Sequence, residues 1–250
     1  MRYFAIVSYS GERYSGFQRQ KNRPSIQGEI EKQLSFYLGR KTEIKGAGRT
    51  DAGVHAIGQT FTFDTAGSLD AHKTLIALNR LLPEDIFLRD LRMVRDDFDA
   101  RRDAVSKTYR YVFTVNDRDP LRTGKIAQLR RDDFQFEPFL RALMCFKGKH
   151  DFRNFTTKPE DEGGFVRTVS SIEAIAEENG NLVTVILSGD GFMRYQIRMM
   201  MGAAIRVGLG RLDEKTIVDH LDRPERDILP YKAPSCGLTL VEVNYGETLV

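Results

Sequence analysis

The stretch that decides the fold runs from Gly46 to Asp64 and reads GAGRTDAGVHAIGQTFTFD. Its first part, GAGRTDAGVHA, holds one carboxylate, Asp51, among glycines and alanines, so few side chains keep a ligand away from the backbone. From Gln59 onward, polar and apolar residues alternate, which predicts a half-buried strand. Ile44 leads into the loop from a second predicted strand. We therefore expect a glycine-rich loop with Asp51 at its centre, held between two strands.

The same order of predicted elements occurs in two parts of the chain: strand, helix, strand, strand, helix, strand. This is the ferredoxin-like split βαβ order, so the sequence predicts an α+β fold with two such halves, residues 1–104 and 105–250. Their antiparallel sheets would face a central cleft, and no Pro- or Ser-rich linker separates them. The predicted elements of the first half are strands at 3–9, 59–64 and 86–94, a strand that includes Ile44, and helices at 25–38 and 71–82. Those of the second half are strands at 107–115, 166–176, 182–188 and 237–245, helices at 138–146 and 192–207, and an additional helix at 213–221.

Composition narrows the class of protein. The chain has 250 residues and is 41% hydrophobic, which is enough for one large domain or two small ones. We expect no signal peptide, and the sequence contains no apolar run long enough to span a bilayer. The 2 cysteines and 4 histidines are scattered, a pattern that favours neither a disulfide framework nor a metal site. We therefore expect a cytoplasmic protein that binds no metal.

The net charge of +3 is modest, but the cations gather in four segments. If these segments converge in space, they form a phosphate-binding surface. The alternative is charge spread over a solvated surface. The cations of the four segments are Arg13, Arg19, Lys21 and Arg23; Arg40, Lys41, Lys45 and Arg49; Arg101, Arg102, Lys107 and Arg110; and Arg194, Arg198, Arg206 and Arg211.

The string GAGRTDAGVHA, followed one residue later by GQ, closely resembles the signature of the TruA-type tRNA pseudouridine synthases. In that family the Asp of GRTDAGVH is catalytic, so the resemblance assigns catalysis to Asp51. From the residues alone, an Asp in such a loop is more often a turn former whose carboxylate binds its own backbone. The resemblance extends along the chain, because residues 150–155 look like the family's D-F-x-x-F turn and residues 233–243 resemble its closing strand.

A second segment, residues 98–111, carries the pair Tyr109 and Tyr111 on one face of a predicted strand. Two aromatics at this spacing are usually core residues. The segment is similar to the family's F-x-A-R turn and K/R-x-Y-R-Y strand, in which the first Tyr belongs to the active site. The resemblance therefore implies that Tyr109 stacks on a flipped uracil and takes part in proton transfer. Arg101 matches the Arg of the turn, and we assign it to RNA contact.

A third segment, residues 189–202, predicts a helix with an apolar core face and with Arg194 and Arg198 one turn apart. An Arg on such a helix is most often solvent-exposed. The segment resembles the family's M-V-R-x-[MI]-V-G helix, although Gln196 and Ile197 stand where the family has Met-Val. The resemblance implies that Arg198 pairs with the catalytic carboxylate. A fixed guanidinium would keep Asp51 ionised against the desolvation of a uracil-sized pocket.

The polar loop from Ser10 to Gln20 combines aromatic and basic residues, which suits stacking and phosphate contacts with RNA. The family usually has Trp where this chain has Phe17, and this chain contains no Trp. The open alternative is that Phe17 pins the loop to the body of the protein. The predicted RNA contacts are Phe17, Arg19, Arg49, Arg101, Tyr109 and Arg194.

The resemblance implies a cofactor-free isomerase that converts uridine to pseudouridine in the anticodon arm of tRNA and works as a homodimer. The N-glycosidic bond would break, and C5 of the uracil would rejoin C1′ of the ribose. Attack of Asp51 on the base and attack on the ribose both remain open. Two other functions also stay open: an RNA-binding or RNA-chaperone protein without chemistry on the same scaffold, and a related synthase for another RNA.

Overall fold

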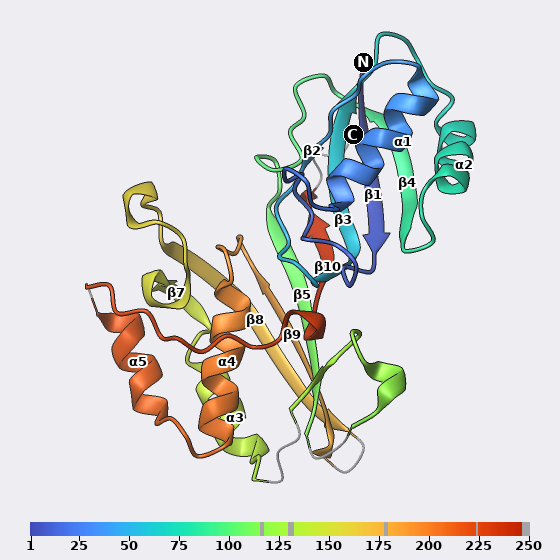
Figure 1. The fold of residues 1–250 in the computed structure, drawn as a ribbon. Helices are drawn as coiled ribbons and strands as arrows, with labels where there is room; N and C mark the ends of the chain where they lie inside the picture. The colour runs from blue at the N-terminus through green and yellow to red at the C-terminus, as the bar shows by residue number, and fades with distance from the viewer. Residues whose placement is uncertain (116–117, 130–132, 178–179, 224, 247–250) are drawn as a thin grey trace. The chain divides into compact units, whose positions relative to one another are not determined.

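The structure is a computed structural model that describes residues 1–115, 118–129, 133–177, 180–223 and 225–246 (Figure 1). The chain forms two compact units: unit 1 comprises Met1–Lys107 and the segment from Thr239 onward, and unit 2 comprises Thr108–Leu238. Both contain helices and strands, so the predicted α+β class is confirmed. The boundary lies close to the predicted junction at residue 104. The closing strand, however, falls in unit 1 from Thr239 onward, not with the second half.

The sheet of unit 1 is centred on β1 (Arg2–Tyr9) and β3 (His55–Asp64). β3 and β4 (Ile86–Val94) both pair antiparallel with β1. The other edge of β3 holds β2 (Lys45–Gly46), which is antiparallel, and β10 (Leu238–Asn244), which is parallel. Before β10, the elements of unit 1 therefore follow the predicted order, while a pair of ferredoxin-like halves stays a prediction.

Two helices complete unit 1, α1 (Ile26–Leu38) and α2 (Ala71–Leu81), which contact each other, and α2 also packs against β4 (Figure 1). α1 begins as predicted, because the Ser25 hydroxyl accepts a hydrogen bond from the Gly28 N–H at 3.2 Å. It ends at Gly39, whose φ of 64° lies in the left-handed region. Ile26 and Leu34 of the predicted apolar stripe are buried. The stripe therefore faces the core, as its helical spacing predicts.

Tyr245 explains why the closing segment belongs to unit 1. Its ring centroid lies 5.4 Å from that of Phe4 and 5.2 Å from that of Phe98. Its hydroxyl donates to the Ala100 carbonyl at 2.7 Å and also bonds the Thr60 hydroxyl. The end of the chain thus completes an aromatic core whose other members come from the first hundred residues.

The sheet of unit 2 runs in the order β5 (Ser106–Thr114), β9 (Leu182–Gly189), β8 (Val166–Glu177) and β7 (Gly148–Asp151). β8 and β9 form the predicted antiparallel hairpin, and β7 pairs antiparallel with β8. A short strand, β6 (Ala127–Gln128), pairs in parallel with β5.

Three helices contact one another in unit 2 (Figure 1): α3 (Phe136–Met144), α4 (Gln196–Gly208) and α5 (Glu214–Asp222). α4 begins at Gln196, later than the predicted start at Phe192. The buried Gln196 side chain accepts the Met193 N–H at 2.9 Å, and Tyr195 has a left-handed φ of 62°. This turn holds the preceding residues out of the helix.

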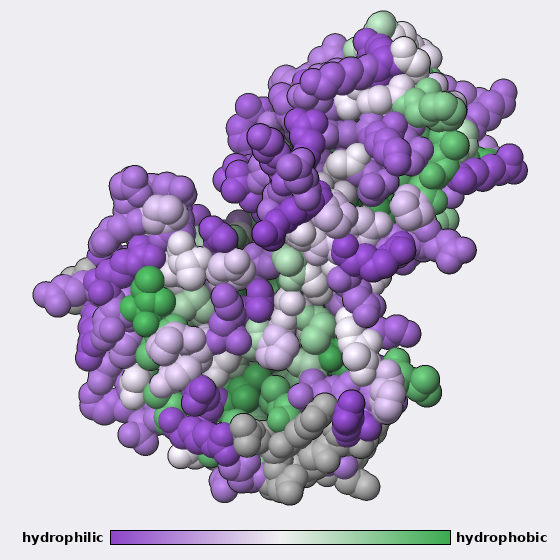
Figure 2. All heavy atoms as spheres, in the orientation of Figure 1, coloured by the Kyte–Doolittle hydropathy of each residue, from purple (hydrophilic) through white to green (hydrophobic). Residues whose placement is uncertain are grey.

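Hydrophilic residues dominate the face shown in Figure 2, with a hydrophobic strip along β4 and α2 of unit 1. Exposed apolar side chains of these two elements include Ile76, Phe87 and Met93. No helix within the described ranges has both the length and the apolar character needed to cross a membrane.

Candidate functional site

Asp51 lies in the loop between β2 and β3, and its side chain is half-buried. The Val54 N–H donates to the Asp51 carbonyl at 3.1 Å, which closes a four-residue turn. Gly53, at the third position, has a φ of 77°, as a type II turn requires. The neighbouring Arg49 is exposed. The carboxylate therefore sits at the first position of a tight turn whose backbone is defined.

Other segments of unit 1 hold the backbone carbonyls that precede this turn. The bonds join Ala47 O to Lys107 Nζ at 2.8 Å, Gly48 O to Gln59 Nε2 at 3.2 Å, and Thr50 O to the Phe17 N–H at 3.1 Å. Buried backbone carbonyls need such partners, and each partner here comes from a different segment. The loop is thereby fixed along its length and does not rely on its own glycine-rich sequence for order.

Two glycines of the 10–20 loop allow its backbone to approach the Asp51 loop closely. A Cβ atom on Gly11 would lie 2.1 Å from the Val54 carbonyl oxygen, and one on Gly16 would lie 2.5 Å from that of Thr50. Gly16 also has a φ of 104°, which disfavours any side chain. The Tyr9 hydroxyl adds a 2.8 Å hydrogen bond with the Thr50 hydroxyl beneath the loop.

Phe17 is only 3% exposed, and its ring packs beside that of Tyr9 and against Gly46, where a Cβ would lie 2.4 Å from the ring. This position fits the alternative in which Phe17 pins the loop. Arg19 keeps a half-exposed side chain, but its guanidinium donates to Glu31 at 2.8 Å and lies 3.5 Å from Glu43.

Lys107 is a cation that binds the Asp51 loop from another segment, and its ammonium also lies 2.8 Å from where a Cβ of Gly48 would be. Burial and, as the smaller cause, the charge of Arg101 lower the pKa of Lys107 to about 8. A cation thus binds the loop's backbone four residues before the carboxylate. Sequence reasoning counted Lys107 only as one member of a basic segment.

In unit 2, Tyr109 lies on β5 and is 8% exposed, and its ring meets that of Phe192 edge-on at 5.4 Å. Tyr111 is fully buried, and its hydroxyl donates to the Pro234 carbonyl at 3.0 Å. Burial raises the pKa of Tyr111 far above its usual value. Of the predicted pair, Tyr111 is therefore a core residue, Tyr109 is buried almost as fully, and the stacking of Tyr109 on a base stays a prediction.

Arg198 lies in the first turn of α4, and two hydrogen bonds join it to Ala233 in the segment Pro230–Pro234. Its Nε donates to the Ala233 carbonyl at 2.9 Å, and the Ala233 N–H donates to the Arg198 carbonyl at 2.8 Å. The side chain is half-buried. This reciprocal pair fixes the position of the arginine on the helix.

Tyr195, which sequence reasoning missed, gathers three cations around its ring. The charged groups of Lys232, Arg194 and Arg198 lie 4.1, 4.9 and 5.4 Å from the ring centroid. An aromatic face attracts cations in this way, and the left-handed backbone of Tyr195 is a conformation that costs energy in residues other than glycine. The signal available in the sequence was a tyrosine between two arginines, RYQIR, at the start of a helix.

The structure therefore groups the predicted residues into two sets. Asp51, Arg49 and Arg101 belong to unit 1, while Tyr109 and the Arg194–Arg198 pair belong to unit 2. The pairing of the carboxylate with Arg198 stays a prediction. Over the described part of the chain, no group of His, Cys, Asp or Glu side chains is arranged to hold a metal ion.

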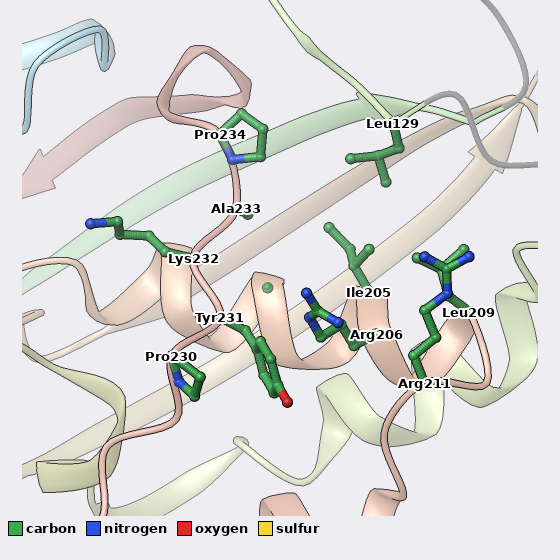
Figure 3. A pocket seen from close by; sticks show the side chains of 11 residues that line it. Leu129, Ile205, Arg206, Leu209, Arg211, Pro230, Tyr231, Lys232, Ala233 and Pro234 are labelled. Atoms are coloured by element: carbon green, nitrogen blue, oxygen red, sulfur yellow. The ribbon is translucent and has the colours of Figure 1, made fainter.

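Unit 2 also contains a pocket of about 310 Å³ between α4 and the segment Pro230–Pro234 (Figure 3). Arg206, Arg211, Tyr231 and Lys232 line it, together with apolar residues of α4.

Comparison with known proteins identifies the family. A sequence profile described as tRNA pseudouridine synthase matches residues 5–102 and 142–246. The tRNA pseudouridine synthase A of Streptococcus pneumoniae (strain P1031) is 36% identical over 248 residues, which cover 98% of this chain and 99% of that protein. The protein of the same name from Mycoplasma genitalium is 33% identical over 244 residues, which cover 98% of each chain.

Among solved structures, the chain is similar to one in the crystal structure of a Cbf5-Nop10-Gar1 complex, with a TM-score of 0.41 and 11% identity over 95% of this chain and 57% of that chain. A similarity this weak supports no conclusion. The profile match and the two relatives, in contrast, show that the chain belongs to the tRNA pseudouridine synthase family.

Proposed function

We propose that this protein isomerises uridine to pseudouridine in the anticodon arm of tRNA without a cofactor. The observation that carries the proposal is the Asp51 loop, in which three segments of unit 1 hold the backbone around one half-buried carboxylate. Membership of the tRNA pseudouridine synthase family supports the same chemistry. A group that starts a reaction must be held close to its productive geometry, and this loop provides such support.

The reaction needs no outside reagent because its atoms balance. The bond from N1 of the uracil to C1′ of the ribose breaks, the base turns, and C5 bonds C1′. The proton on C5 is lost, and N1 gains one. Asp51 starts this sequence as an ionised carboxylate that attacks the base or the ribose. Tyr109 stacks on the uracil and moves a proton, and Arg198 keeps Asp51 ionised.

The target base must leave its stack before it can react. Flipping costs a few kcal/mol, which phosphate contacts and stacking in the site offset. The exposed arginines Arg49, Arg101 and Arg194 are the proposed phosphate contacts. Arg19 contributes less, because carboxylates already engage its guanidinium. Phe17 acts by pinning the 10–20 loop, because its ring is buried.

The protein is further proposed to work in the cytoplasm as a homodimer on tRNA. β4 lies at an end of the sheet of unit 1 and exposes Phe87 and Met93, so an apolar edge strand is available for association. Sedimentation at micromolar concentration measures the association, and a monomer at all concentrations would contradict it.

Tritium release tests the activity. Anticodon-arm RNA labelled with tritium at C5 of uridine should release the label to water with the wild-type protein, because C5 loses its hydrogen when it bonds C1′. Asp51→Ala should release none while binding the RNA with near-normal affinity. RNA binding by the wild type without release would favour a non-catalytic RNA-binding protein. Release only from another RNA would favour a related synthase.

A further inference from the structure

The pocket on α4 has the mixed chemistry that a nucleotide requires (Figure 3). Its lining combines apolar residues with an aromatic ring and three cations, and no carboxylate is among the lining residues. The apolar lining residues are Leu129, Gly202, Ile205, Leu209, Pro230, Ala233 and Pro234, and the others are Arg206, Arg211, Tyr231 and Lys232. An apolar ligand would leave the cations unpaired, whereas a planar base with a phosphate suits both kinds of residue.

Two of the three cations have no acidic partner within the described part of the chain. Arg211 forms an ion pair with Asp133 at 2.9 Å. Neither Arg206 nor Lys232 pairs with a carboxylate among the described residues. The Arg206 guanidinium instead lies 4.1 Å from the Tyr231 ring centroid, a stacked arrangement that leaves its edge available to donate hydrogen bonds. The pocket therefore carries uncompensated positive charge beside an aromatic face.

The walls of the pocket are held in place. A Cβ on Gly202 would lie 2.8 Å from the Tyr231 carbonyl, so only glycine lets Tyr231 approach the helix this closely. Two residues further along the same segment, Ala233 accepts a hydrogen bond from the Arg198 side chain and donates one to the Arg198 carbonyl. Arg206 follows Arg198 by two turns of α4, a rise of about 12 Å. One segment thus contacts α4 both at the pocket and at the arginine proposed for catalysis.

We propose that this pocket binds one nucleotide of the RNA strand, other than the uridine that reacts. The base lies against Tyr231 and the apolar residues of α4, and the free edge of the Arg206 guanidinium contacts the phosphate. The volume of about 310 Å³ suits a single nucleotide, at the low end of the roughly 300–1,000 Å³ typical of ligand pockets. The choice of RNA as the source of the nucleotide rests on the proposed function.

A tryptophan placed in the pocket tests occupancy directly, because the chain contains no tryptophan of its own. Tyr231→Trp keeps an aromatic face for Arg206 and makes the pocket the only source of tryptophan fluorescence. Titration with anticodon-arm RNA should quench this signal over the same concentration range in which the RNA binds. The control is Phe36→Trp, on the surface of α1, where the native side chain is 73% exposed. Its fluorescence should stay unchanged.

A charge variant supplies the second arm of the test. Arg206→Gln should weaken RNA binding about 3- to 10-fold at low salt, reduce the salt dependence by about 0.7 of a log unit per log unit of salt, and remove the quench. The matched control is Lys147→Gln, an exposed lysine elsewhere in unit 2. An equal loss of affinity in the control would overturn the pocket as a specific site.

Uridine monophosphate separates the two possible sources of a nucleotide. Quenching of Tyr231→Trp by the free nucleotide but not by RNA contradicts the proposal, as does the absence of any quench. Turnover is followed in parallel on the wild-type protein. A quench by RNA without pseudouridine formation would support the nucleotide site and contradict the proposed function. Normal turnover without a quench would support the proposed function and contradict the nucleotide site.

Discussion

The Asp51 loop of unit 1 and the Tyr195 cluster of unit 2 are built by different means. Hydrogen bonds to its backbone carbonyls and close glycine contacts define the loop, and its partners come from three separate segments. The cluster consists of long cationic side chains around one aromatic ring. Hydrogen bonds to several successive carbonyls fix the backbone of the loop closely, whereas long side chains grouped around a ring can adapt to a ligand. The Asp51 loop is therefore the more closely fixed of the two regions.

The largest effect should come from the cation proposed to serve the chemistry. Arg198→Leu should reduce turnover by at least about a thousandfold, because the carboxylate would lose the charge that keeps it ionised. Circular dichroism and thermal unfolding check that the fold persists. The matched control is Arg194→Leu, since Arg194 precedes Arg198 by four residues and contacts the same Tyr195 ring. This variant should mainly weaken RNA binding. Near-normal turnover in Arg198→Leu would refute the pairing.

Next comes a direct disturbance of the loop. Gly16→Ala places a Cβ 2.5 Å from the Thr50 carbonyl at a φ of 104°, so the two backbones must move apart. We expect turnover to fall about 100-fold and the free energy of unfolding to fall by about 1–3 kcal/mol. Gly39→Ala is the comparison, since it shares a positive φ but has open space around it. It should lower stability without a comparable loss of turnover.

A smaller effect should follow removal of the lysine that binds the loop. Lys107→Met keeps the length of the side chain but leaves the Ala47 carbonyl without its donor. We expect turnover to fall about tenfold with little change in KM, because the loop loses order while RNA contacts persist. Lys107→Arg, which can still donate, should recover part of the rate. A rise in KM alone would assign Lys107 to RNA binding instead.

The smallest effect is the contribution of Lys107 to the pH dependence of stability. Its pKa is about 8 in the folded protein and about 10.5 in the unfolded chain, so the unfolded state binds more protons between these values. This group therefore makes the free energy of unfolding rise with pH above about 8. The contribution of Lys107 is measured as the difference between the wild type and Lys107→Met in how the free energy of unfolding by denaturant changes between about pH 8 and pH 10. Identical slopes for the two proteins would contradict the lowered pKa.

Local features of the fold were predictable from the sequence. The Ser25 cap and the apolar stripe of α1 depend on neighbours within a few turns, and both are confirmed. The start of α4 was misplaced because the Gln196 side chain binds the Met193 N–H and Tyr195 adopts a left-handed backbone, neither of which periodicity reveals. The assignment of the last strand to unit 1 depends on Tyr245 meeting Phe4, a contact between the two ends of the chain.

The same limit applies to the site. The Asp51 loop was identifiable because its composition is unusual and continuous in the sequence. The bond from Lys107 to Ala47 joins residues 60 positions apart, and the lowered pKa of Lys107 follows from burial that the sequence does not display. Tyr195 was overlooked because one of its three cations, Lys232, comes from a distant segment.

The most direct test of the central claim compares the wild type with Asp51→Asn, which preserves the size of the side chain and removes its charge. Both proteins are mixed with anticodon-arm RNA, and pseudouridine in the RNA is quantified by mass spectrometry while RNA affinity is measured in the same buffer. We expect the wild type to convert the RNA, and the variant to bind it equally well and convert none. Conversion by the variant at a rate near that of the wild type would contradict the claim that the loop exists to present a catalytic carboxylate.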